Sequence, residues 1–129
     1  MSSKDFSELI GVSYEEMNCW DLTRSFYKKV FGLDLKHYYS DTPQDRDETQ
    51  GLIYTNKGDF VRVESPVFGD IILISVLGLE SHIAVYVGDG MLLHTGKRKG
   101  SVIDRLSHWD KVVVGYYRAT GESVLNDYT

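Results

Sequence analysis

The second half of the chain repeats apolar residues at every second position, the period with which an extended strand buries one face. The pattern begins after Gly51, where Val61 and Val63 alternate with Arg62 and Glu64. It predicts further strands over Asp70 to Val76, His82 to Val87, Met91 to Thr95 and Val112 to Ala119, with glycines between them. Because no long helical pattern separates these strands, we expect antiparallel pairing and not parallel crossovers.

One clear helical pattern precedes the strands. Apolar side chains recur at helical spacing in this stretch and predict a helix from about Cys19 to Phe31. Asn18 is a favoured N-cap residue, and Gly32 is a suitable stop. A shorter helix is predicted around Phe6 to Ile10, before Gly11. A helix packed on a small antiparallel sheet is an α+β architecture, which is the fold class that we expect.

Length and cysteine content limit the architecture further. A chain of 129 residues normally folds as one domain, so residues 1–129 are expected to form a single unit. The polar residues 40–50 are expected to form an exposed excursion from that unit. The chain contains one cysteine, so it can form neither an internal disulfide nor a four-cysteine zinc site.

Charge and hydropathy exclude several classes of protein. The longest apolar run, about nine residues from Ile71 to Leu79, is well short of the roughly 20 that a bilayer-spanning helix needs. Fourteen Lys and Arg against nineteen Asp and Glu give a net charge of −5, without the basic stripe that binds nucleic acid. The residues Met1 to Glu8 lack the apolar core of a signal peptide. We expect neither membrane insertion, nucleic-acid binding nor export by a signal peptide.

The single cysteine, Cys19, lies at the first position of the predicted helix, and two interpretations compete for it. Unpaired N–H groups and the helix dipole favour a thiolate at this position and can lower a thiol pKa from about 8.5 into the range of about 3.5 to 7.5. Alternatively, Cys19 is a small buried apolar residue on the stripe formed by Leu22 and Phe26. The cysteine alone favours the second interpretation.

Two histidines on a predicted hairpin change this balance. His82 and His94 lie on neighbouring strands that are joined through Gly88-Asp89-Gly90. If the numbers of paired residues add to an even total, both imidazoles lie on one face, directly opposite or on a diagonal. An odd total would put them on opposite faces and exclude the pair. His37 and His108 fit no such arrangement and are interpreted as surface residues.

Cys19, His82 and His94 are therefore candidate catalytic residues. A thiolate attacks as the nucleophile, a neighbouring imidazole takes and returns its proton, and a third polar group orients that imidazole. The competing use of the same residues is a zinc site with one thiolate and two imidazoles. We rank the metal site lower, because the sequence has no close ligand pairs and no obvious fourth ligand.

The order of these residues resembles the NlpC-type cysteine peptidases, which are papain-like cell-wall endopeptidases. The resemblance covers most of the chain and rests on several short segments. They are Gly11-Val-Ser-Tyr14, Asn18-Cys-Trp-Asp-Leu22, Gly69-Asp-Ile-Ile72, Ser81-His-Ile-Ala-Val-Tyr-Val-Gly88 and Leu93-His-Thr95. The Cys-Trp form and the segment Gly32-Leu-Asp-Leu35 are most similar to the small peptidases associated with bacteriophage tails.

The resemblance implies a reaction and a substrate. Cys19 would attack an amide carbonyl, His82 would be the general base, and His94 would orient His82. Tyr14 and Ser81 would contact the oxyanion or the substrate, and no metal or other cofactor would be needed. The substrate would be a stem peptide of peptidoglycan, cleaved at a γ-D-glutamyl to diamino acid bond.

The resemblance also implies a location and leaves one alternative open. It places the protein in a virion tail, or in the host cytoplasm during assembly, with other phage tail proteins as partners. The sequence departs from the family where Asn18 replaces the usual Asp, Asp21 replaces a small residue, and the loop between Tyr14 and Cys19 is short. These departures motivate the alternative, which is a structural component of the tail with the same fold and little or no peptidase activity.

Overall fold

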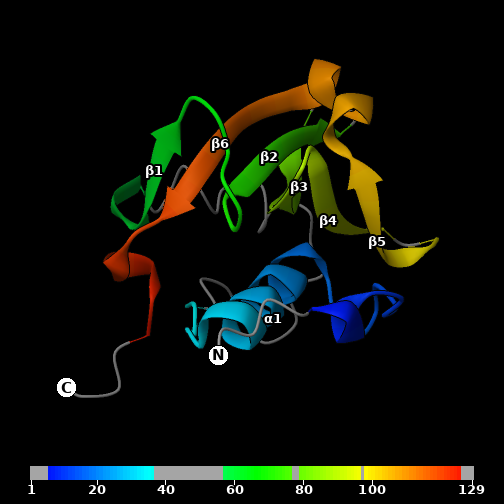
Figure 1. Ribbon diagram of the computed structural model, residues 1–129, viewed down its shortest axis with the longest axis horizontal. Helices are drawn as coiled ribbons and strands as arrows, with labels where there is room; N and C mark the ends of the chain where they lie inside the picture. The colour runs from blue at the N-terminus through cyan, green and yellow to red at the C-terminus, as the bar shows by residue number, and fades with distance from the viewer. Residues whose placement is uncertain (1–5, 37–56, 77–78, 97, 126–129) are drawn as a thin grey trace.

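The computed structural model describes residues 6–36, 57–76, 79–96 and 98–125, and it consists of one α-helix beside an antiparallel sheet (Figure 1). The helix is α1 (Cys19–Phe31). The strands are β1 (Phe60–Val63), β2 (Ile71–Val76), β3 (Leu79–Gly88), β4 (Met91–Gly96), β5 (Gly100–Arg105) and β6 (Val113–Ala119). They form a six-stranded sheet in the order β1-β6-β2-β3-β4-β5. The α+β prediction is confirmed. The predicted excursion at residues 40–50 lies outside the described residues.

Short 3-10 turns connect or flank these elements: η1 (Ser7–Leu9), η2 (Lys57–Asp59), η3 (Leu106–His108), η4 (Asp110–Val112) and η5 (Gly121–Ser123). The sequence pattern did not predict β5, because its segment does not alternate apolar and polar residues. No helix within the described part of the chain is long and apolar enough to cross a membrane.

Both ends of α1 are fixed by local sequence, as predicted. The Asn18 side chain accepts a hydrogen bond of 2.9 Å from the backbone N–H of Asp21, which satisfies one of the free donors at the start of the helix. Gly32 ends the helix in the left-handed conformation, with a φ of 71°, and its N–H donates to the carbonyl of Lys28. The predicted boundaries therefore match the observed ones.

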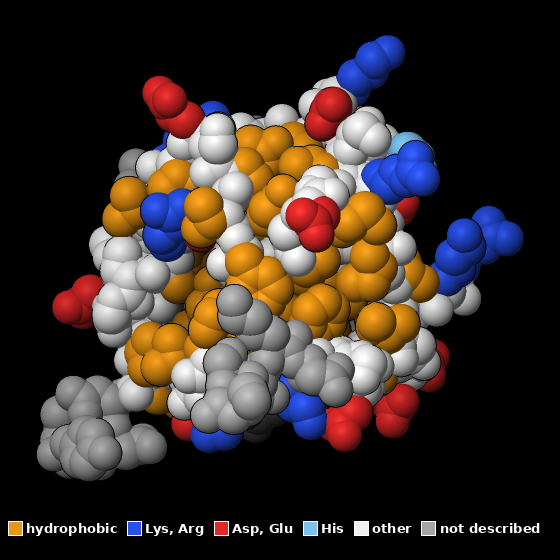
Figure 2. Space-filling view, in the orientation of Figure 1, with side chains coloured by type: hydrophobic (Ala, Val, Ile, Leu, Met, Phe, Trp, Pro, Cys, Tyr) orange, Lys and Arg blue, Asp and Glu red, His pale blue; other side chains and the backbone are white. Residues whose placement is uncertain are grey.

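The sheet is buried on both faces. The face that carries α1 holds the larger core, which we call the helix-side core. Its buried members are Cys19, Trp20, Leu22, Phe26, Tyr27, Val30, Leu35, Phe60, Ile71, Leu73, Ile83, Val85, Leu93 and Tyr117. The smaller core on the other face, the far-side core, consists of Ile72, Ile74, Ala84 and Leu92, with Tyr86, Leu106, Trp109, Val113 and Tyr116 packed against it. In the view of Figure 2, apolar side chains gather over the middle of the molecule and most charged ones lie toward the rim.

The β3–β4 hairpin has the register that puts alternate residues of both strands on a common face. Val85 pairs with Leu93 and Tyr86 with Leu92, so the paired numbers add to an even total. The turn itself has two residues, Asp89 and Gly90, with φ of 55° and 75°. Such a turn alone would give an odd total, but a register shift between Tyr86 and Gly88 restores the even one.

An ion pair between buried Asp70 and exposed Arg118 ties the start of β2 to β6, and the neighbouring Gly69 connects it to α1. Asp70 is 2% exposed and accepts hydrogen bonds from Nε and Nη2 of Arg118, at 2.9 and 2.8 Å. The hydroxyl of Tyr27 in α1 donates to the carbonyl oxygen of Gly69. The segment Gly69-Asp70 therefore holds the helix and two strands in one arrangement.

The segment before α1 is attached to the outer edge of β5. The N–H of Gly11 donates to the Ser101 carbonyl at 2.8 Å, and the N–H of Ser101 donates to the Val12 carbonyl at 2.9 Å. This close approach is possible because Gly100 has no side chain. A Cβ atom at Gly100 would lie 2.5 Å from the carbonyl oxygen of Val12, and its φ of +73° is also unfavourable for other residues.

We expect Gly100→Ala to destabilise the fold by roughly 2 kcal/mol or more, because it adds both a backbone clash and a strained φ. Urea unfolding followed by circular dichroism measures the effect. Gly121→Ala is the matched control, since a Cβ there meets no atom within 4 Å and the residue has no positive φ. Equal unfolding free energies for the two variants would show that β5 does not need this close contact.

Candidate active site

The two predicted histidines meet on the far side of the sheet. Nε2 of His82, on β3, and Nδ1 of His94, on β4, are joined by a hydrogen bond of 3.1 Å. The rings are nearly perpendicular, with an interplanar angle of 87°. Ala84, which shares a face with His82, belongs to the far-side core, as does Leu92, which shares a face with His94. The register is therefore the even one, the case in which both imidazoles lie on one face.

Trp109, between η3 and η4, covers the two imidazoles. Its ring stacks on His82 with a centroid distance of 6.0 Å, and it meets the His94 ring edge-on at 4.9 Å. Trp109 also packs against the far-side core. The tryptophan therefore shields the histidine pair from water on this side, a role that its position in the sequence did not reveal.

Asp104, on β5, is the charged group of this site. It accepts hydrogen bonds from the backbone N–H of Arg105 at 2.7 Å, from Trp109 Nε1 at 3.1 Å and from His108 Nδ1 at 2.8 Å. Its Oδ2 lies 3.9 Å from Nε2 of His94. Burial alone would raise the pKa of Asp104, but these hydrogen bonds outweigh it and lower that pKa. The carboxyl group is therefore ionised at neutral pH.

The His94 side chain is 11% exposed. Burial lowers the pKa of His94, and the Asp104 carboxylate opposes this shift only in part. His94 is therefore neutral at pH 7. His108, which was interpreted as a surface residue, is exposed, and its Nδ1 hydrogen-bonds to Oδ1 of Asp104.

Sequence reasoning missed Asp104 and Trp109. Asp104 pairs with Leu92 and therefore shares the far face with His94, but this follows only from the β4–β5 register. The available signal was the short polar spacing Asp104 to His108. That spacing has no meaning until β5 is recognised as a strand.

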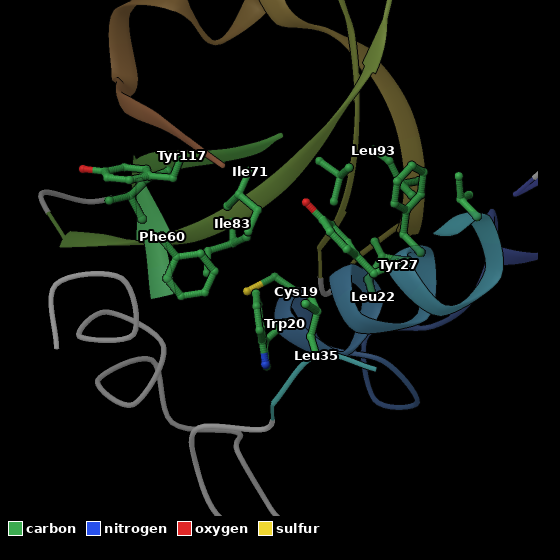
Figure 3. Close-up of a cluster of buried hydrophobic side chains, with 14 residues drawn as sticks. Cys19, Trp20, Leu22, Tyr27, Leu35, Phe60, Ile71, Ile83, Leu93 and Tyr117 are labelled. Carbon is green, nitrogen blue, oxygen red and sulfur yellow. The ribbon is translucent and has the colours of Figure 1, made fainter. Parts of the chain in front are cut away.

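Cys19 lies on the other face of the sheet from the two imidazoles. It is 5% exposed and belongs to the helix-side core, among Trp20, Phe60 and Ile83 (Figure 3). Its sulfur is stabilised by the backbone N–H of Ile83, the residue that follows His82. The structure thus brings His82 and His94 together, and it places the Cys19 thiol one residue away along β3 but on the opposite face.

Of the two interpretations of Cys19, the structure favours the small buried apolar residue. Burial raises the pKa of Cys19 to about 11, although the N–H groups of Ile83, Trp20 and Cys19 act in the opposite sense. The negative charge of Asp21 adds to the increase. Desolvation in the helix-side core therefore outweighs the helix amino terminus, and the thiol is protonated at neutral pH.

The two predicted substrate contacts lie in different segments of the chain. Tyr14 is half-buried in the segment that leads to α1, and Ser81 lies in β3, although its side chain is outside the described part. Their roles stay predictions. The alternative zinc site does not form here, because Cys19 and the two histidines lie on opposite faces. Within the described ranges, no group of three or more His, Cys, Asp and Glu is arranged to hold a metal ion.

Comparisons with known proteins agree with this fold. Residues 8–118 match the model of the NlpC/P60 family. An NlpC/P60 family protein from Bacillus cereus is similar in structure, with a TM-score of 0.64 and 20% identity over 88% of this chain; the match covers 37% of that protein. The NlpC/p60 domain of the peptidoglycan hydrolase SagA gives a TM-score of 0.57 and 16% identity, covering 88% of this chain and 92% of that domain. At these identities the structural likeness concerns the fold alone. No curated protein matched the sequence.

We expect the rate of Cys19 alkylation by iodoacetamide to rise about tenfold per pH unit from pH 6.5 to 9.5, without a plateau, because only the thiolate reacts and its pKa is about 11. Mass spectrometry counts the adduct on the single cysteine. The urea-unfolded chain is the control and should level off above its ordinary thiol pKa, near 8.5. A rate independent of pH below 7 would instead reveal a thiolate paired with an imidazolium.

Proposed function

Because the chain belongs to the NlpC/P60 family, we propose that it is a cysteine endopeptidase that cleaves the peptide stems of peptidoglycan. The observation that carries the proposal is the His82–His94 hydrogen bond, together with a sole cysteine at a capped helix start. A peptidoglycan hydrolase among the proteins of similar fold supports the substrate class. Within that class we propose the bond between γ-D-glutamate and the diamino acid.

In the proposed reaction the Cys19 sulfur attacks the amide carbonyl while His82 takes the thiol proton. A carbon–sulfur bond forms, the carbon–nitrogen bond breaks, and His82 returns the proton to the leaving amine. Water then hydrolyses the thioester, with His82 again as the base. The backbone N–H of Cys19, at the start of α1, would stabilise the oxyanion. Since the thiol is neutral at rest, proton transfer accompanies the attack and does not precede it.

This reaction requires the His82 imidazole to reach the helix side of β3. Two features favour such a movement. The backbone N–H of Ile83 interacts with the Cys19 sulfur, and Ile83 directly follows His82. The sulfur and the His82 imidazole are therefore on the two faces of the same strand, β3. The β2–β3 pairing also shifts between Ile74 and Val76, next to the residue that pairs with His82. Irregular pairing of this kind re-aims side chains near active sites.

We further propose that the enzyme acts with a bacteriophage tail, in the virion or in the host cytoplasm during tail assembly, where other tail proteins are its partners. The support is the similarity of Asn18-Cys-Trp-Asp-Leu22 and Gly32-Leu-Asp-Leu35 to the tail-associated peptidases.

A second function, a structural part of the tail without peptidase activity, is favoured by one observation. Cys19 is buried, its pKa is raised to about 11, and its partner imidazoles lie across the sheet. A protein that keeps the fold and has lost catalysis would tolerate this separation, whereas a peptidase must close it during turnover.

We expect wild-type protein to release soluble muropeptides from purified cell walls and Cys19→Ala to release none, because the nucleophile is lost. Mass spectrometry of the products identifies the cleaved bond. Lys28→Ala, on the exposed side of the same helix, is the control and should keep wild-type activity. Equal release by wild type and Cys19→Ala would contradict a cysteine peptidase, and an absence of release by both would support the structural role.

A further inference from the structure

We infer that Asp104 is a positioning residue that sets which ring nitrogen of His94, and through it of His82, carries the proton. The inference rests on the proposed peptidase function for its consequence in catalysis, but its geometry stands independently. Neutral histidine has one protonated and one unprotonated ring nitrogen, and a base must present the unprotonated one to its substrate.

The Asp104 carboxylate is held in a fixed orientation. The Arg105 amide and His108 donate to Oδ1, and Trp109 Nε1 donates to Oδ2. The pairing of Leu92 with Asp104 and of His94 with Val102 brings the carboxylate diagonally beside the His94 ring. Oδ2 therefore faces Nε2 of His94 across 3.9 Å.

Nε2 of His94 is buried and makes no hydrogen bond within the described part of the chain. If this nitrogen carried a lone pair, two acceptors would face each other in a site of low polarity. If it carries a proton, a positive N–H end faces a carboxylate. The second arrangement is favoured electrostatically, so Asp104 selects the form of His94 that is protonated at Nε2.

The choice at His94 determines the choice at His82. With its proton on Nε2, neutral His94 presents a lone pair at Nδ1, which lies 3.1 Å from Nε2 of His82. The hydrogen bond between them then needs a proton on Nε2 of His82. In the neutral form of His82 the lone pair is then on Nδ1, and this is the nitrogen that would take the Cys19 proton.

Trp109 contributes to the same arrangement. Its indole N–H occupies one side of Oδ2 and limits the directions in which the Asp104 carboxylate can turn. Its ring packs on both imidazoles, so no water replaces the carboxylate as their partner from that side. Trp109→Phe keeps the ring and removes only the donor.

Two-bond 15N–1H correlation spectra of histidine-labelled protein, recorded above the imidazole pKa values, test the inference without requiring activity. Wild type should show His94 protonated at Nε2 alone. In Asp104→Asn, whose amide can donate to Nε2, the His94 signals should shift toward the form protonated at Nδ1. Trp109→Phe should give a smaller shift in the same direction. Asp110→Asn, an exposed acid nearby, is the control.

For an active enzyme we expect Asp104→Asn to lower kcat roughly tenfold or more with little change in KM, since the residue acts on the base and not on the substrate. An unchanged His94 signal in both Asp104→Asn and Trp109→Phe would overturn the inference, as would a wild-type His94 protonated at Nδ1. An absence of peptidase activity in the wild-type protein would contradict the proposed function. The spectra would then still test the inference about Asp104.

Discussion

Successive side chains of β3 point to opposite faces of a sheet that is buried on both sides. This alternation decides how the candidate site is built. The Ile83 side chain packs in the helix-side core, and its backbone N–H interacts with the Cys19 sulfur. The His82 side chain lies on the far side and hydrogen-bonds to His94. The site is therefore divided between two cores, and a shift of one residue in register would exchange them.

The rest of the architecture keeps β3 and α1 in this relation. Asp70 is buried and bound through two hydrogen bonds to Arg118, while Tyr27 in α1 reaches the carbonyl of the preceding Gly69. Gly69 also lies under the Phe31 ring, where a Cβ atom would come within 2.8 Å. The short Gly69-Asp70 segment thus connects the helix to the sheet. These contacts give a structural reason for the Gly-Asp motif.

Local patterns in the sequence predicted what local interactions decide. The caps Asn18 and Gly32 gave the helix boundaries, and the alternation around His82 reduced the common face of the two imidazoles to a question of hairpin register. Asp104 was missed because its role depends on strand pairing with Leu92. The choice between the two interpretations of Cys19 also depended on distant parts of the chain. Its helix position is local, but its burial by Phe60 and Ile83 comes from distant parts of the chain.

At rest the Asp104 carboxylate, the negative charge of the site, lies apart from the Cys19 thiol. Cys19 and His94 are neutral at pH 7, and the ionised group is Asp104, on the outer side of the histidine pair. In the proposed reaction a charge appears on the imidazole and on the oxyanion only during attack. A fixed carboxylate behind the imidazoles and fixed N–H groups at the start of α1 then act most strongly on the transition state, because they need no reorganisation. A buried, unreactive thiol is therefore compatible with catalysis if substrate binding brings His82 to its side of β3.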